Sequence, residues 1–211
     1  MQLAPGVSFD ETKHEYWYKG KQLSGVTGLI SKKLGLKYFN DYVGEHTEEG
    51  IHVHKAIQRW IETGDSGSIH PGVTWLTEEL GKLCGRSYLL AETLVSDFHK
   101  YASAVDIIAQ DDDGLVICDI KKGKFNREYV TWQLSIYKYL IERLVFDADT
   151  SNPPYLMVCD FEAKKWHYIV KNCVCICLKD KEFYPIFPKS TEDVEKLLYG
   201  INVKDEKIRI C

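Results

Sequence analysis

The sequence predicts an α/β fold, with a central mixed β-sheet flanked by helices, in a single domain that covers residues 1–211. Three extended apolar segments follow one another within residues 87–121. A strong helical pattern covers about 128–145, and further strand-like segments follow the Asn-Pro-Pro at 152–154. Strands and helices in this mixed order are typical of one mixed sheet with helices on its faces.

Residues 1–85 are predicted to form a mainly helical N-terminal section that opens with a hairpin. The stretch HEYWYKGKQL at 14–23 is typical of two strands that turn at Lys19-Gly20. Ser24 is expected to cap a short helix whose apolar positions are Val26, Leu29 and Ile30. The remaining elements of the section are a helix over about 38–62, a loop over 64–72 and a weak helix over 73–84.

Residues 86–146 carry the core strands and the strong helix, and residues 147–211 add C-terminal strands and a helix. The core strands are SYLLAETLVS, KYASAVDIIAQ and LVICDIK. In the C-terminal part, YLMVCDF and WHYIV form a predicted hairpin, and CVCICL is a further strand. The segment STEDVEKLLYG opens with a capping signal for a closing helix.

Composition and charge describe an ordinary globular protein and exclude a global basic field. The net charge is −4, so a nucleic-acid partner would require a local basic groove. No apolar run approaches the roughly 20 residues that span a bilayer, so no membrane partner is expected. The N-terminus has no signal-peptide pattern, and the seven cysteines are therefore expected to be reduced thiols in the cytoplasm.

Asp106, Asp119 and Lys121 are the first candidate site residues. If Gln110 pairs with Leu115 across the Asp-Gly turn, Asp106 and Asp119 lie opposite one another, with Cβ atoms ~5 Å apart, and Lys121 shares their face. Two facing carboxylates repel unless a cation lies between them, and a divalent metal such as Mg²⁺ resolves this conflict. The alternative is a surface strand end where Asp119 and Lys121 make a weak salt bridge.

Two helices add polar residues to apolar faces. Gly50, His54, Ile57 and Ile61 share one face, which makes His54 either a metal ligand or a hydrogen-bonded core histidine. After the lysine, Gln133 and Tyr137 lie one turn apart on a helix. They share its face with apolar residues, namely Val130, Ile136, Leu140 and Leu144. The alternative for this pair is ordinary core and rim packing.

Together these residues resemble the PD-(D/E)XK nuclease superfamily, in particular its RecB-like and phage-exonuclease branch. GIHVH is similar to the G-x-x-x-H helix of that branch, AVD to its first-aspartate motif, DIK to its D-x-K motif and QLSIY to its Q-x-x-x-Y helix. LSGVTGLI is similar to a stretch of phage exonucleases and of mitochondrial genome maintenance exonucleases, although Gly25 departs from that pattern. The five motifs occur in family order over about residues 14–145.

The resemblance implies a restriction-endonuclease-like core and a catalytic centre that holds Mg²⁺ or Mn²⁺. The implied metal ligands are His54, Asp106, Asp119 and the Ile120 carbonyl, and Lys121 would contact the attacking water or the phosphate. Glu92 stands where the family often has a glutamate on its first core strand, and the alternative is an exposed strand glutamate. Some relatives hold an iron–sulfur cluster, but the C-x-C-x-C spacing of Cys173, Cys175 and Cys177 differs from theirs, so a cluster is not expected.

The predicted function is hydrolysis of DNA by a divalent-metal-dependent exonuclease of phage-type recombination or repair. Gln133 and Tyr137 would contact substrate, and Lys122, Lys124 and Arg127 would either bind the DNA backbone or form a solvated charge run. The alternatives are an endonuclease of the same fold, structure-specific or of the CRISPR-adaptation type, and a catalytically idle DNA-binding module. DNA is the expected partner, and further candidates are a second copy of the chain and a single-strand annealing protein.

Overall fold

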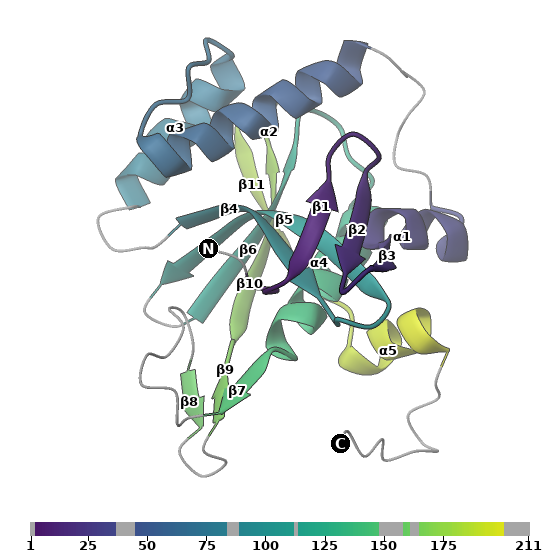
Figure 1. Cartoon of the computed structure of the whole chain (residues 1–211). Helices are drawn as coiled ribbons and strands as arrows, with labels where there is room; N and C mark the ends of the chain where they lie inside the picture. Colours follow the sequence, from purple (N-terminus) through teal and green to yellow (C-terminus); the bar gives the residue numbers. More distant parts are fainter. Residues whose placement is uncertain are drawn as a thin grey trace.

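A computed structural model describes residues 3–36, 45–83, 89–111, 114–147, 158–160 and 165–200 (Figure 1). Its strands in the first half are β1 (Val7–Asp10), β2 (Glu15–Tyr18), β3 (Lys21–Gly25), β4 (Leu89–Ser96), β5 (Tyr101–Asp111) and β6 (Gly114–Lys121). The later strands are β7 (Val145–Asp147), β8 (Val158–Asp160), β9 (Lys165–His167), β10 (Val170–Cys177) and β11 (Glu182–Ile186). The helices are α1 (Val26–Leu34), α2 (Glu45–Thr63), α3 (Pro71–Leu83), α4 (Arg127–Glu142) and α5 (Thr191–Tyr199).

The central sheet has eight strands and is mixed, as the sequence predicts. Seven strands follow the order β1-β2-β3-β5-β6-β10-β11, and β4 pairs with β5. The β3–β5 and β6–β10 pairs are parallel, and the other neighbouring strands in the sheet are antiparallel. A second sheet, β7-β9-β8, was not predicted: the expected β8–β9 pairing forms, but it continues onto β7 and not onto the central sheet.

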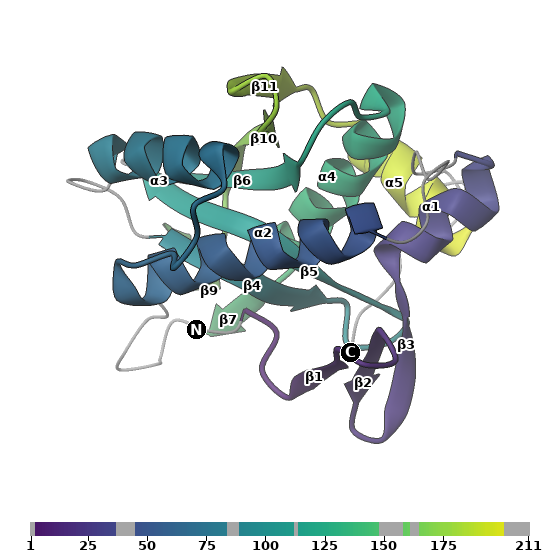
Figure 2. The same cartoon turned by 90° about the horizontal axis from the view of Figure 1, so that it is seen from above.

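Helices cover both faces of the central sheet and bury two apolar cores (Figure 2). On one face, α1, α4 and α5 pack on β5, β6 and β10, with Leu134, Ile117 and Leu198 fully buried. On the other face, α2 and α3 pack on the same strands through Ile57, Leu76 and Ile120. The apolar alternation of β6 serves both cores, because successive side chains of a strand point to opposite faces. None of the helices in the described ranges has the length and apolar character that a membrane span requires.

The N-terminal section contains the predicted hairpin and the helices α1, α2 and α3, and it also contributes strands to the central sheet. Three strands open the chain, with the predicted turn at Lys19-Gly20, and β3 joins the central sheet by pairing Ser24 with Tyr101. The strand β1 was not predicted because its four residues are too few to carry an alternating pattern. The predicted helix over 38–62 begins at Glu45, and residues 38–44 lie outside the described ranges.

Two helix caps were predicted from the sequence. The cap of α5 is confirmed, and the cap of α1 is wrong. The Ser190 side chain accepts a hydrogen bond from the Asp193 N–H and caps α5, as expected. Ser24 does not cap α1, because it belongs to β3 and its own N–H donates to the Lys100 carbonyl. The N-cap of α1 is Gly25, which offers no side-chain oxygen. The helix α4 ends at Glu142, earlier than predicted, because Val145 begins β7.

The two serines give a matched test of this assignment. Ser190→Ala is expected to lower the free energy of unfolding by about 1 kcal/mol, because the first turn of α5 loses its capping acceptor. Ser24→Ala is expected to change it by only a few tenths of that amount, since the exposed Ser24 hydroxyl caps no helix. Urea unfolding of both variants measures the difference. Equal losses at the two positions would contradict the cap assignment.

Candidate active site

The site begins where the β5–β6 hairpin ends. Gln110 pairs with Leu115, which confirms the predicted register, and the ladder continues as far as Ile107 opposite Cys118. At the next position a side chain takes the place of a backbone acceptor. Asp106 Oδ2 accepts a hydrogen bond of 2.6 Å from the Ile120 N–H. Asp106 is therefore held against β6 immediately beside Asp119.

Asp106 lies in an opening of the sheet. One edge of β5 pairs with β6 from Ile107 onward and with β3 at Tyr101 and Ala102. The other edge of β5 pairs with β4 over residues 102–109. The segment 103–106 lies between the β3 and β6 ladders. Val105 belongs to the core beneath α4, whereas Ile107 belongs to the core beneath α2 and α3. Asp106 thus stands where the two cores meet, and its carboxylate can be reached from a helix on either face.

Helix α2 brings His54 to this opening. Val53 and Ile57 anchor the helix in the second core, and His54 on the same turn keeps 32% of its side chain exposed. His54 Nδ1 lies 3.1 Å from Glu92 Oε1 and 3.6 Å from Asp106 Oδ1. One ligand atom from each of these three residues lies within 4.8 Å of the other two.

Glu92 enters the site from β4 with a strained backbone. Its neighbours pair regularly with β5, Ala91 with Ile107 and Thr93 with Val105, which places Glu92 across from Asp106. The φ of Glu92 is 45°, a left-handed value that costs a residue with a Cβ free energy and is uncommon outside glycine. The sequence offered Glu92 only through the family resemblance, because no local pattern signals a left-handed residue inside a strand.

Asp119 and Lys121 form a buried pair beside the three-residue cluster. Lys121 Nζ donates to Asp119 Oδ1 at 3.0 Å and lies 2.9 Å from Oδ2. Their side chains are 1% and 8% exposed, so this is not the exposed surface salt bridge that the sequence left open. Asp119 is not a member of the cluster of His54, Glu92 and Asp106, and its predicted metal ligation stays a prediction. Ile120 joins through its N–H, and the role of its carbonyl likewise stays a prediction.

Burial and mutual charge set the protonation of these groups. Burial raises the pKa of Asp119 to about 6, with Lys121 opposing the rise and Asp106 adding to it. Burial also raises the pKa of Asp106, against the opposing charge of His54. Burial lowers the pKa of His54, but the Asp106 and Glu92 carboxylates outweigh it and raise that pKa to about 9. The cationic His54 and Lys121 side chains thus compensate the buried acids.

Helix α4 adds a polar chain to the floor of the site. Gln133 and Tyr137 are buried on the face that the sequence predicted, 4% and 1% exposed. Gln133 Nε2 donates to the Tyr137 hydroxyl at 2.8 Å, and Ser103 Oγ on β5 donates to the same hydroxyl at 3.1 Å. Within the described part of the chain, Gln133 Oε1 is a buried oxygen without a hydrogen-bond partner. Gln133 is also one of the residues that line the cleft described below.

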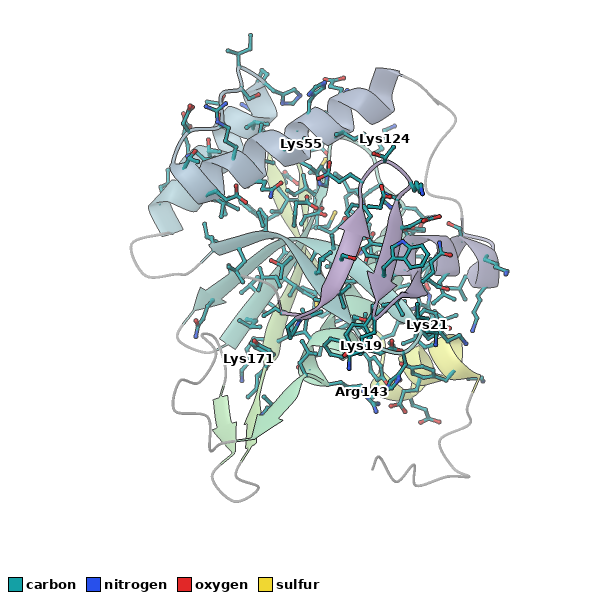
Figure 3. All side chains as sticks on the ribbon, in the orientation of Figure 1. Lys19, Lys21, Lys55, Lys124, Arg143 and Lys171 are labelled. Atoms are coloured by element: carbon teal, nitrogen blue, oxygen red, sulfur yellow. The ribbon has the colours of Figure 1, made fainter. Side chains whose placement is uncertain are left out.

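One cleft of ≈ 1740 Å³ is lined by the polar side chains described above, namely His54, Glu92, Ser103, Asp106, Asp119, Lys121, Gln133 and Tyr137. Of the basic residues that the sequence proposed, Lys122 and Lys124 line it, and Lys122 pairs with Glu49. Arg127 is not among the described residues that line it, and donates at 2.9 Å to the Pro185 carbonyl. Sequence reasoning missed further lining residues, which come from distant elements: Lys55, Lys179, Lys181 and Ser103. Figure 3 labels Lys55 and Lys124 at the α2 end of the molecule, whereas Lys171 lies at the opposite end.

Cys173, Cys175 and Cys177 alternate on β10 and are buried free thiols. Cys175 pairs across the parallel ladder with Asp119, and Cys177 with Lys121. Burial raises the pKa of Cys173 to about 12, and it also raises the pKa of the other two thiols. Cys173 and Cys175 pack within the apolar core beneath α4, whereas the Cys177 thiol donates hydrogen bonds to the Gly123 carbonyl and to Asp180 Oδ2.

The donor set of the cluster fits a divalent ion. It combines an imidazole nitrogen with two carboxylates, a set that suits Mn²⁺ and, through its oxygens, Mg²⁺. Neighbouring ligands of an octahedral Mg²⁺ ion lie about 3.0 Å apart. The distances from His54 Nδ1 to Glu92 Oε1 and to Asp106 Oδ1, 3.1 Å and 3.6 Å, are close to this spacing. A cation would also offset the burial, and the neighbouring Glu92 charge, that raise the pKa of Asp106.

No protein-family model matches this chain, and no similar protein is found among the curated proteins.

The protonation of His54 predicts how stability depends on pH in the presence of a chelator. The two carboxylates hold the His54 proton more tightly in the folded chain, so protonated His54 contributes to the free energy of unfolding. This stabilisation is complete below the unfolded pKa of ~6.5 and disappears as pH rises toward 9. The substitution His54→Gln removes this stabilisation. The melting temperatures of the wild type and of this variant should therefore differ at the low end of the window and converge at its upper end. A gap that does not change with pH would contradict the assignment.

The same proton competes with a metal ion. Mn²⁺ is expected to raise the melting temperature, and to raise it more as pH increases toward 9, because binding must displace the His54 proton. Asp106→Asn is the matched control, since it keeps the shape of the side chain and weakens the ligand set. Equal melting curves in Mn²⁺ and in chelator would exclude a metal site at these residues.

The strain at Glu92 predicts an unusual order of stability for two substitutions. Glu92→Gly and Glu92→Ala both remove the carboxylate, but the glycine variant should be more stable by about 1 kcal/mol, because glycine adopts the left-handed conformation without steric cost. At the neighbouring Ala91, which pairs regularly, Ala91→Gly should instead destabilise the protein. Unfolding in denaturant gives both values. An alanine variant as stable as the glycine variant would show that Glu92 is unstrained.

Proposed function

We propose that this protein is a divalent-metal-dependent nuclease that hydrolyses DNA phosphodiester bonds. One observation carries the proposal: the cluster of His54, Glu92 and Asp106 shares a cleft with the buried Asp119–Lys121 pair. A site that holds cation ligands and a fixed ammonium group at its floor suits an anionic substrate. The restriction-endonuclease-like identity of the fold belongs to the same proposal, and it rests on the resemblance of the motifs.

His54, Glu92 and Asp106 would hold the metal ion, with Asp119 as a further ligand if Lys121 shifts. When bound, the ion would polarise the phosphodiester and lower the pKa of a water molecule. These three residues come from α2, β4 and β5, so the fold, not a single loop, fixes their spacing. Rigid elements hold such a constellation more closely than loops do.

Lys121 would stabilise the negative charge that develops on the phosphate. Asp119 accepts its hydrogen bond and keeps the ammonium group in one position within the sheet. Because both side chains are almost fully buried, water screens their charges little and an approaching phosphate feels them strongly. Gln133 Oε1 would accept a hydrogen bond from the substrate or from the attacking water.

An exonuclease is the favoured form of this activity because the motifs resemble those of phage exonucleases. An endonuclease of the same fold differs in one outcome, cleavage of a covalently closed circle. A catalytically idle DNA-binding module is the less favoured alternative, because burial of two carboxylates beside a lysine costs free energy that binding alone does not require.

The decisive experiment is digestion of end-labelled linear DNA and of a closed circle, with Mn²⁺, with Mg²⁺ and with chelator. Metal-dependent loss of linear DNA with an intact circle is the expected result. Lys121→Met, which keeps the volume of the side chain, should lower the rate by about a hundredfold or more, as expected for a group that stabilises transition-state charge.

Lys171→Met is the matched control, since Lys171 is exposed on β10 far from the cleft and its loss should leave the rate unchanged. A folded Lys121→Met protein with wild-type turnover would remove Lys121 from the reaction. No hydrolysis of any DNA by the wild type, with metal bound, would reject the nuclease and favour the idle module.

A further inference from the structure

The hairpin of β1 and β2 forms one wall of the cleft. Phe9, His14 and Tyr16 line the cleft together with the acidic residues and Lys121. Figure 1 shows the hairpin in front of β5, with its turn at the level of α2. An ion pair of 3.0 Å between Glu11 in this turn and Lys55 on α2 joins the two elements. The hairpin is thus positioned beside the path to the candidate site.

The wall is aromatic. The Phe9 and Tyr16 rings are stacked with centroids 4.7 Å apart, and the His14 ring meets Phe9 edge-on at 5.1 Å. Tyr16 is buried, but Phe9 is half-buried and His14 is exposed. The outer rings of this cluster are therefore accessible from the cleft, although the innermost one is fixed in the core. Rings held in this way can accept a planar ligand without losing much conformational freedom.

Lysines occupy other parts of the cleft wall. Lys122 and Lys124 follow β6, and Lys179 and Lys181 belong to the turn between β10 and β11. The two turns are adjacent, because the Lys179 N–H donates to the Lys122 carbonyl at 3.0 Å. The cleft thus presents a local basic surface in a chain whose net charge is −4. Such a surface suits a chain of phosphates.

A cleft with an aromatic wall and a basic wall distinguishes single strands from duplexes. In a duplex the base faces are stacked on one another, so only unpaired bases can stack on protein rings. We propose that the β1–β2 hairpin is a stacking platform for unpaired bases, and that the cleft accepts single-stranded DNA or the frayed end of a duplex. This inference rests on the proposed function in one respect, that the substrate of the cleft is DNA.

Binding in chelator tests the platform without requiring hydrolysis. The probes are a fluorescent oligo-dT and a blunt hairpin duplex with the same number of phosphates. The variants are Phe9→Leu, which keeps an apolar contact with Tyr16, and His14→Asn, which tolerates the left-handed φ of 55° at that position. Trp17→Leu is the matched control, because Trp17 is an exposed aromatic residue of the same hairpin that does not line the cleft.

The wild type is expected to bind the single strand at least tenfold more tightly than the duplex. Phe9→Leu and His14→Asn should each weaken single-strand binding, by about fivefold or more for a lost stacking contact, with unchanged melting temperatures. Trp17→Leu should bind as the wild type does. Equal affinity for both probes, or unchanged affinity in the folded Phe9 and His14 variants, would overturn the platform.

The outcome is separable from that of the proposed function. A protein that binds oligo-dT through Phe9 and His14 but hydrolyses no DNA supports the platform and rejects the nuclease. A protein that hydrolyses DNA, but whose folded Phe9→Leu and His14→Asn variants bind oligo-dT as tightly as the wild type does, supports the nuclease and rejects the platform.

Discussion

The burial of Asp106 and Asp119 in an apolar sheet is the constraint on which the rest of this site depends. Carboxylates removed from water require compensating charge or hydrogen bonds, and the structure supplies both. Asp106 accepts the Ile120 N–H and faces His54, and Asp119 is paired with Lys121. Because these compensating groups come from α2 and β6, the packing of both elements is tied to the charge balance of the site.

The opening in the sheet explains why the acids are accessible as well as buried. Strands β3 and β6 share one edge of β5 and leave the segment 103–106 between them, so the sheet does not close over Asp106. Helix α4 covers the opening from one face with Gln133 and Tyr137, and α2 approaches with His54. The result is a cleft whose floor is polar although its surroundings are two apolar cores.

Local charge in this molecule differs from its overall charge. The net charge is −4, yet lysines from the turns after β6 and β10 gather on one cleft wall. Short-range electrostatics depends on such local groupings more than on net charge, because salt screens charges that lie more than about 10 Å apart. Glu92 also contributes to the local charge, because its strained backbone conformation holds a third carboxylate of the site beside His54.

The sequence by itself determined the features that repeat along a strand or a helix. These features are the class of fold, the β5–β6 register, the buried face of α4 with Gln133 and Tyr137, and the Ser190 cap. Each depends on alternation, helical period or capping, which are properties of residues near one another in the chain. Tertiary structure alone decided that β3 pairs with β5 and that His54 contacts Glu92 from 38 residues away. These contacts join segments whose separation in the chain leaves no periodic signal, and packing around the opening in the sheet selects them.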